Sequence, residues 1–144
     1  DTVQAIAAHA IREYPSECCG IITGTTTLQR VHPCTNRQDE LHARDPEQHP
    51  RTSREAYDID RAEMEAIFRD AEAAGETVIA FYHSHIDCGA YFSAMDRAVL
   101  TVFGEPEFPD AVHVVVSVQH RSVKELVGYR WDRRAQDFVA LSVI

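Results

Sequence analysis

Residues 81–96 combine side chains whose types and spacing could bind a metal ion. His83 and His85 are two positions apart at the end of a predicted strand. Side chains two apart on a strand point to the same face, so both imidazoles can reach one ion. Asp96 lies in the first turn of the next predicted helix and can add a carboxylate oxygen. Two histidines, one aspartate and a water form a tetrahedral zinc site that keeps an open position for catalysis.

Each part of this pattern also has a purely structural interpretation. Ser93 and Asp96 are three positions apart and share one face of a helix, but Ser-x-x-Asp at a helix start also forms a capping pair. An isolated His-x-His is more often surface or core histidine than a pair of ligands. The occurrence of all these residues in one short segment is what favours a metal site.

A glutamate far upstream could complete the chemistry. Glu17 stands in Pro-Ser-Glu-Cys-Cys-Gly, where the first predicted helix passes into the first predicted strand. A glutamate at such a junction is by default a solvated charge. Beside a metal-bound water, a carboxylate can instead take the water's proton, because the metal lowers the pKa of that water to about 7.

The set of residues resembles the signature of the JAMM (MPN-plus) zinc metalloproteases. That signature is carried here by Glu17, then His83-Ser84-His85, then seven residues, then Ser93-x-x-Asp96. The resemblance extends over roughly residues 1–142, and we expect a single JAMM/MPN domain over 1–144. It implies a cytidine-deaminase-like JAMM/MPN architecture.

The resemblance also implies a mechanism. The Zn²⁺ ligands would be His83, His85 and Asp96. Glu17 would hold and deprotonate the zinc water, and Ser93 would stabilise the oxyanion of the tetrahedral intermediate. No covalent acyl-enzyme is needed in this scheme, so the cysteines need not be nucleophiles.

The substrate expectation follows from the same family. JAMM enzymes hydrolyse peptide or isopeptide bonds after the C-terminal glycines of ubiquitin or ubiquitin-like proteins, and this compact chain is similar to the stand-alone prokaryotic members. We therefore expect a zinc-dependent hydrolase acting on a ubiquitin-like or sulfur-carrier protein with a C-terminal Gly-Gly. Residues 36–54 and 86–92 are the candidate segments for gripping that tail.

Two positions depart from the family pattern. Proline is common just after the second histidine and just before the serine, whereas this chain has Ile86 and Phe92 there. Proline would stiffen the loop by fixing φ, so its absence leaves the rigidity of the loop and the placement of Ser93 open. Cys88 lies in the same loop and is either an incidental thiol or a group that can approach the zinc and respond to oxidants.

The elements that must position these residues follow from the hydrophobic pattern. Asp60 and Glu63 have capping-box spacing at the start of one helix. Residues 36–54 are polar and are predicted to form a long loop. Helices are predicted over 2–14, 60–75 and 93–103, and strands over 18–24, 27–35, 77–83, 111–118, 123–131 and 138–143. This order predicts a mixed α/β domain of the α+β type, with helices on a central, mostly antiparallel sheet.

Composition narrows the classes of function. The 144 residues contain 23 Asp and Glu against 14 Lys and Arg, a net charge of −9. Nucleic-acid binding is disfavoured, because proteins that bind the phosphate backbone are normally basic. No apolar run approaches the ~20 residues that a membrane helix needs, so we expect no membrane partner. The oligomeric state stays open.

The cysteines and the remaining histidines are expected to be structural. No CxxC pair occurs, so a four-thiolate zinc site is not supported. Reduced, buried thiols at Cys18, Cys19 and Cys34 fit a cytoplasmic protein. His113, in a valine-rich strand, is expected to be a hydrogen-bonded core residue. The other histidines are expected at the surface: His9, His32, His42, His49 and His120.

Three other functions were weighed against the hydrolase. A non-catalytic MPN-fold scaffold is the main alternative, although such relatives usually lose the glutamate or the ligands that this chain keeps. A nucleobase deaminase would need His-x-Glu and Pro-Cys-x-x-Cys, and neither motif occurs. A thiol redox protein would use a CxxC pair rather than the adjacent Cys18 and Cys19.

Overall fold

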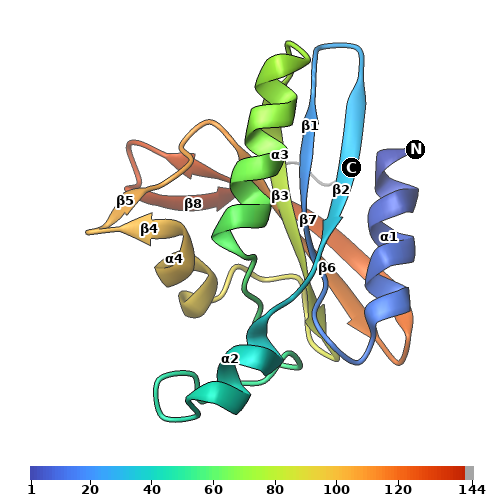
Figure 1. Ribbon diagram of the computed structural model, residues 1–144, viewed down its shortest axis with the longest axis vertical. Coiled ribbons are helices and arrows are strands. Elements are labelled where there is room, and N and C mark those ends of the chain that lie inside the picture. Colours follow the sequence, from blue (N-terminus) through green and yellow to red (C-terminus); the bar gives the residue numbers. More distant parts are fainter. Residues whose placement is uncertain (142–144) are drawn as a thin grey trace.

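A six-stranded sheet forms the centre of the computed structural model, which describes residues 1–141. The strands lie in the order β2-β1-β3-β6-β7-β8, and β4 and β5 form a separate two-stranded sheet (Figure 1). The helices are α1 (Thr2–Glu13), α2 (Gln38–Arg44), α3 (Arg61–Ala73) and α4 (Ala94–Leu100). The strands are β1 (Cys19–Gly24), β2 (Gln29–Cys34), β3 (Thr77–Ile86), β4 (Thr101–Val102), β5 (Glu105–Pro106), β6 (Val112–Gln119), β7 (Ser122–Asp132) and β8 (Asp137–Ala140).

The direction of the strands confirms the predicted fold class. β3 and β6 run parallel, and every other neighbouring pair in the central sheet is antiparallel. The sheet is therefore mixed but mostly antiparallel, with helices packed against it (Figure 1). None of the helices in the described part of the chain is long and apolar enough to span a membrane.

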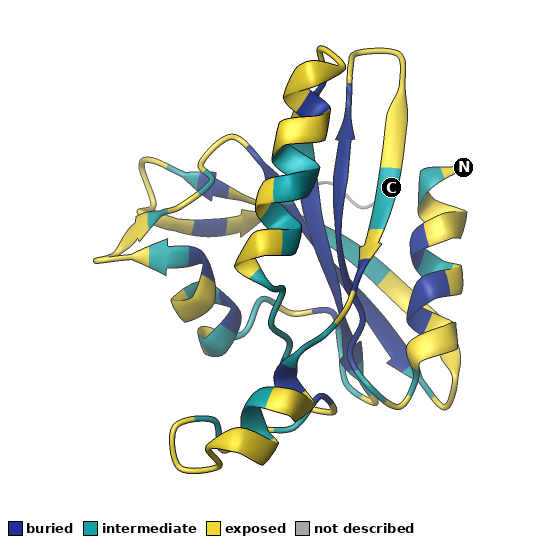
Figure 2. Ribbon diagram, in the orientation of Figure 1, coloured by how far each residue is buried: buried dark blue, intermediate teal, exposed yellow. Residues whose placement is uncertain are grey.

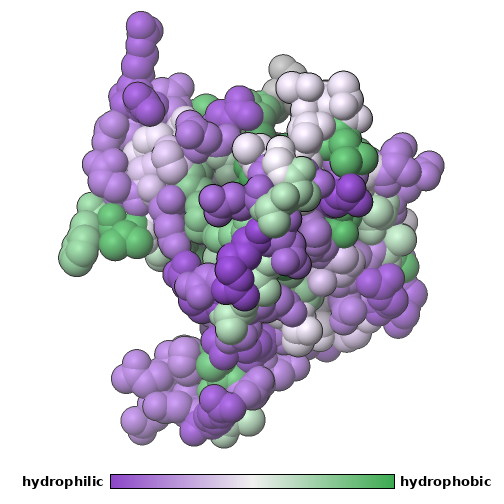
Figure 3. Space-filling model, turned by 45° about the horizontal axis from the view of Figure 1, so that its top comes forward, coloured by the Kyte–Doolittle hydropathy of each residue, from purple (hydrophilic) through white to green (hydrophobic). Residues whose placement is uncertain are grey.

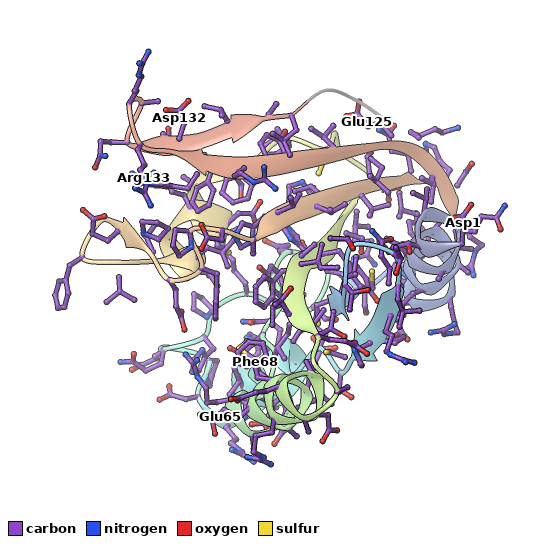
Figure 4. All side chains as sticks on the ribbon, turned by 90° about the horizontal axis from the view of Figure 1, so that it is seen from above. Asp1, Glu65, Phe68, Glu125, Asp132 and Arg133 are labelled. Carbon is purple, nitrogen blue, oxygen red and sulfur yellow. The ribbon has the colours of Figure 1, made fainter. Side chains whose placement is uncertain are left out.

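Two helices cover opposite faces of the sheet. Alternate side chains of β3 point to opposite faces, so Tyr82 packs in the cluster beneath α1 and Phe81 in the cluster beneath α3. β1, β3 and β6 lie between the two layers and are largely buried, whereas β2 is an exposed edge strand (Figure 2). In Figure 4, Phe68 of α3 is directed toward the sheet and Glu65 away from it, as expected for an amphipathic helix.

Residues 36–54 are not a continuous loop, so that prediction is wrong over α2. Leu41 is the one large apolar residue of α2 and no apolar stripe marks the helix. Polar contacts hold it instead, because the buried Gln38 side chain donates to the Arg51 carbonyl oxygen at 2.9 Å and Arg44 pairs with Glu40. A helix held by polar side chains gives no signal in a hydrophobic pattern.

Three predicted boundaries and one predicted cap also change. The strand predicted over 77–83 continues to Ile86, so it includes both His83 and His85. The helix predicted over 93–103 ends at Leu100, and the next residues form the β4–β5 hairpin, with positive φ at Phe103 and Gly104 in its turn. The strand predicted over 138–143 is observed to Ala140, and residues 142–143 lie outside the described residues. Asp60 precedes α3 as predicted but makes no side-chain cap, because its carboxylate pairs with Arg37 at 3.2 Å.

Two of the histidines are not as predicted. His9 is buried rather than exposed, and its Nδ1 lies 2.7 Å from the hydroxyl oxygen of Tyr82. His113 is buried as predicted, but neither of its ring nitrogens has a hydrogen-bond partner within the described residues. His113 lies instead among aromatic rings, including Phe81 and Phe138. Cys18, Cys19 and Cys34 are buried free thiols, as predicted.

The face of the molecule drawn in Figure 3 is mostly hydrophilic and carries an apolar projection at one side. Figure 3 shows hydrophobic side chains extending from the side of the molecule where the β4–β5 hairpin lies. Val102 is half exposed there and Phe103 is fully exposed.

Candidate metal centre

The structure brings the three predicted metal ligands together. His83 Nε2 lies 3.0 Å from Asp96 Oδ1, and His85 Nε2 lies 3.2 Å from Asp96 Oδ2. The two Nε2 atoms are 3.3 Å apart. All three residues are buried, and their ligand atoms lie within 4.8 Å of one another. The two histidines come from the end of β3 and the aspartate from the start of α4.

The donor set fits a cation. His85 Nδ1 lies 3.0 Å from the Gly89 carbonyl oxygen, which can only accept, so Nδ1 carries the hydrogen. In the neutral imidazole, Nε2 then keeps a lone pair that could bind a cation, whereas the protonated ring donates from Nε2 to Asp96. A hydrogen bond from the second ring nitrogen is also what orients metal-bound histidines in proteins. The group is therefore suited to hold a metal ion.

The pKa values of the ligands reflect their mutual contacts. Burial alone would raise the pKa of Asp96, but hydrogen bonds from His83 and His85 outweigh burial and hold the pKa well below its usual value. Burial alone would lower the pKa of His85, but its contact with Asp96 outweighs burial and raises the pKa. Asp96 is thus an ionised carboxylate at neutral pH, as a metal ligand must be.

Ser93 and Asp96 form the helix cap that was the alternative interpretation of their spacing. Asp96 N donates to Ser93 Oγ at 3.0 Å, and Ser93 N donates to Asp96 Oδ2 at 3.0 Å. The structural and functional interpretations are compatible, because the cap holds Asp96 in place beside the two histidines. Ser93 Oγ accepts in the cap, so its own hydrogen can still be donated to another group.

Glu17 is buried beside this cluster, so its default interpretation as a solvated charge is wrong. Cys19 pairs with His83 in the β1–β3 register, which places the preceding residues alongside the end of β3. Ser84 secures this segment, because Cys18 N donates to Ser84 Oγ at 2.7 Å and Ser84 N donates to the Cys18 carbonyl oxygen at 3.1 Å. Burial raises the pKa of Glu17 to about 8, although His85 acts in the opposite direction.

The loop without prolines is anchored by the neighbouring strands. Ser117 donates to the Cys88 carbonyl oxygen, and Tyr129 donates to the Ala90 carbonyl oxygen at 2.6 Å. Ala90 N donates in turn to Glu125 Oε1 at 2.8 Å. These contacts from β6 and β7 hold residues 86–92 in the way that proline was expected to do.

Tyr57 belongs to the site but was missed in the sequence. Its ring stacks on His83, with ring centroids 4.5 Å apart and 22° between the planes. The one available signal was an aromatic residue just after a polar stretch, which does not identify a partner 26 positions away. Stacking restricts rotation of the imidazole and supports its orientation.

An open cavity of about 400 Å³ lies over these residues. Glu17, His85, Ser93 and Asp96 line it, together with side chains from residues 51–57 and 86–99. His83 does not line the cavity and lies behind Tyr57. The arrangement can bind a cation next to a buried carboxyl group and a hydroxyl donor, in a space that a chain end can enter.

Comparison with known proteins identifies the family. Residues 1–132 match the family model described as prokaryotic homologues of the JAB domain. The chain belongs to this JAB family. The resemblance to JAMM proteins is therefore confirmed.

Two similar proteins carry names that describe hydrolases. The chain is 33% identical over 135 residues to the CysO-cysteine peptidase of Mycobacterium tuberculosis, covering 90% of this chain and 78% of that protein. It is 28% identical over 150 residues to the desampylase of Haloferax volcanii, covering 99% and 91%. A protein of Desulfitobacterium hafniense, solved in solution, shares the fold with a TM-score of 0.69 at 19% identity, covering 99% and 86%.

Proposed function

We propose that this protein is a zinc-dependent hydrolase that cleaves the peptide or isopeptide bond after the C-terminal Gly-Gly of a ubiquitin-like or sulfur-carrier protein. The observation that carries the proposal is the convergence of His83, His85 and Asp96 next to the buried Glu17. The names of the relatives, a CysO-cysteine peptidase and a desampylase, support hydrolysis and a small protein substrate.

The ligand set supports zinc as the metal. Two imidazoles and one carboxylate leave one position of a tetrahedral site open, and no thiolate takes part. His83, His85 and Asp96 would hold the ion. When bound there, zinc supplies Lewis-acid polarisation of the scissile carbonyl and a lowered pKa of its water.

Glu17 is proposed as the general base and acid. Its burial raises the pKa of the carboxyl group to about 8, and the charge of a bound cation would stabilise the carboxylate that can accept a proton. Glu17 then takes a proton from the attacking water and later passes it to the leaving nitrogen. The bond between the glycine carbonyl carbon and that nitrogen breaks, yielding a glycine carboxylate and a free amine.

Ser93 is proposed as a donor to the developing oxyanion. Its hydroxyl group lines the cavity at the start of α4 and retains a hydrogen to donate. The helix cap fixes this side chain before any substrate binds, so little reorganisation is needed when the charge develops.

A narrow glycine tail suits the cavity above the cluster. Side chains from residues 51–57 and from 86–91 line this cavity, and these ranges overlap the two segments expected to grip the tail. Glycines lack side chains, so an extended Gly-Gly can approach buried ligands closely. We propose that the protein acts in the cytoplasm as one domain and without nucleic acid.

Intact mass spectrometry tests the proposal. The protein would be incubated with a panel of ubiquitin-like proteins whose Gly-Gly tail is extended by one residue or by an isopeptide-linked lysine. We expect zinc-loaded protein to remove the extension, and a chelator or the Glu17→Gln variant to prevent removal. Zinc-loaded protein that cleaves no member of the panel would contradict the proposal and favour the non-catalytic scaffold.

A further inference from the structure

Two arginines line the same cavity as the candidate metal ligands. Arg51 and Arg54 are the basic residues among its described lining, in a protein whose net charge is −9. The pairing of Arg51 with Glu55 is long, at 3.9 Å, and the Arg51 side chain is 50% exposed. None of the ion pairs in the described part of the chain includes Arg54. Both guanidinium groups are therefore available to donate hydrogen bonds to an anionic partner.

The turn that carries these arginines is tied to the backbone of Glu17. Ser53, between them, is buried, and its carbonyl oxygen accepts from Glu17 N at 2.7 Å. Ser53 N and Ser53 Oγ donate to the carboxylate of Asp39 at 2.7 and 2.8 Å. The Arg51 carbonyl oxygen accepts from the buried Gln38 side chain. The backbone under both arginines is thus fixed relative to the proposed base.

We propose that Arg51 and Arg54 form a subsite for the α-carboxylate of a single residue that follows the scissile bond. This inference rests on the proposed function and specifies its substrate, a carrier protein extended by one amino acid with a free carboxylate. Guanidinium groups bind carboxylates through paired hydrogen bonds in a fixed planar geometry. Hydrolysis would add water across the bond and release the carrier with its glycine carboxylate and one free amino acid.

The chemistry of the leaving group separates this substrate from an isopeptide. A residue joined through its α-amine carries its carboxylate two bonds from the leaving nitrogen, close to the cavity wall. A lysine joined through its ε-amine keeps its α-carbonyl at the far end of a four-carbon chain, usually within a peptide bond. Arginines that line the cavity from a backbone tied to Glu17 therefore favour the first kind of leaving group.

A pair of substrates that differ only in this carboxylate tests the subsite. One ubiquitin-like protein from the panel would carry a single alanine after Gly-Gly, prepared as the free acid and as the carboxamide. For wild-type enzyme we expect kcat/KM to be about tenfold or more higher for the acid, as for other hydrogen bonds to charged groups. Arg51→Gln and Arg54→Gln should each reduce that ratio, and the double variant should bring it close to one.

Arg133→Gln is the matched control, because Arg133 lies in the β7–β8 turn (Figure 4) and does not line this cavity. It changes the net charge by the same amount and should keep the wild-type ratio. If the arginine variants lower kcat/KM equally for the free-acid and carboxamide substrates, the arginines contact the carrier itself and the proposal is overturned. If wild-type enzyme cleaves the acid and the amide with equal kcat/KM, the subsite is also overturned, but the proposed hydrolase function is not.

A binding measurement tests the same subsite without turnover. N-acetyl-Gly-Gly-Ala, as the free acid and as the amide, would be titrated into zinc-loaded Glu17→Gln protein and followed by NMR. We expect tighter binding of the acid and signal changes at the Nε–H groups of Arg51 and Arg54. Equal affinity for the two peptides would refute the subsite, whether or not the enzyme cleaves any carrier.

Discussion

Asp96 contributes to the helix cap and to the candidate metal centre through the same oxygen. Oδ2 accepts from Ser93 N at 3.0 Å and lies 3.2 Å from His85 Nε2. The neutral amide of asparagine could keep the cap but would lack the charge that a metal ligand supplies. The helix cap and the candidate metal centre therefore both depend on the same carboxylate of Asp96.

Glu17 is proposed as a base and His85 as a metal ligand, so their substitutions should differ in their effect on metal content. Glu17→Gln should leave about one zinc per chain and lower kcat by about 10²- to 10⁴-fold, because it removes the base but no ligand. His85→Ala should lose both the zinc and the activity. Metal analysis of each purified variant, combined with intact-mass assays, checks this. Wild-type turnover by Glu17→Gln would rule out the mechanism.

The buried Glu17 carboxyl group should make the metal-free protein less stable as the pH rises. The pKa of this group is about 8 in the folded state against its ordinary value of 4.5, so between these pH values the folded state keeps a proton that the unfolded state has lost. The contribution of this group to the free energy of unfolding is complete below pH 4.5 and is lost as the pH rises to 8. The free energy of unfolding falls by up to about 1.4 kcal/mol per pH unit over that range. The free energies of urea unfolding of wild type and Glu17→Gln should therefore be similar at acidic pH and diverge as the pH rises, with wild type becoming the less stable. Parallel curves would contradict the raised pKa.

His113 is a buried polar residue whose replacement should not destabilise the fold. Burial lowers its pKa to about 4, and its ring nitrogens have no partner in the described structure. His113→Phe removes this unsatisfied group among aromatic neighbours. The free energy of unfolding should change by less than about 1 kcal/mol at pH 7. At pH 5 the variant should gain about 2 kcal/mol relative to wild type, because the unfolded histidine is protonated there and the folded one is not. An equal acid-induced loss in both proteins would contradict this.

At the scale of elements, the contact between β3 and the segment before β1 sets the position of the proposed base. Ser84 lies between the two histidines in sequence, but its side chain faces the opposite side of β3 and binds Cys18 N. The same strand therefore presents two candidate metal ligands on one face, and on the other a serine that binds the backbone of the segment before β1. The alternation of side chains along a strand makes this possible.

Breaking this clamp should lower turnover without loss of metal. Ser84→Ala leaves the buried Cys18 N–H without its acceptor, which costs about 1–3 kcal/mol of stability, and frees Glu17 to shift. We expect kcat to fall more than the zinc content. Thr23→Val is the matched control, because Thr23 is a buried hydroxyl of β1 remote from the cavity. A similar loss of kcat in both variants would show that Ser84 acts only through global stability.

At the scale of the molecule, the candidate metal centre joins the central sheet to α4. α4 packs in a separate small cluster around Leu100, Trp131 and Phe138 rather than in either main core. The ligands therefore connect a well-buried strand with a peripheral helix. A bound ion would stabilise the folded state as a whole because the unfolded chain does not assemble the site.

Zinc should therefore raise the melting temperature. With free zinc about 1,000-fold above its dissociation constant, the stabilisation is about 4 kcal/mol. A chelator should reverse the shift, and His85→Ala should show none, as measured by calorimetry. His120→Ala is the control, since His120 is exposed and lies outside the site. A zinc-induced shift that persists in His85→Ala would place the metal elsewhere.

Local sequence was sufficient to predict that His83, His85 and Asp96 lie together, and to predict most elements. The positions of His83, His85 and Asp96 follow from strand alternation and from the first turn of a helix, both of which depend on neighbours in the chain. The buried strands and amphipathic helices were predicted because their apolar residues repeat at the period of the backbone. α2 was missed because its contacts are polar, and the end of α4 because a β4–β5 hairpin competes with the helix.

The sequence by itself thus determined the types and spacing of the candidate ligands and the class of fold. Only the tertiary structure decided that Glu17 is buried beside the ligands, since this depends on the β1–β3 register and on Ser84, which is 67 positions away. It also decided that Arg51 and Arg54 share the cavity. These contacts form only when segments distant in sequence pack together. The hydrophobic periodicity of a short segment predicts its own secondary structure but not which distant segment it will contact.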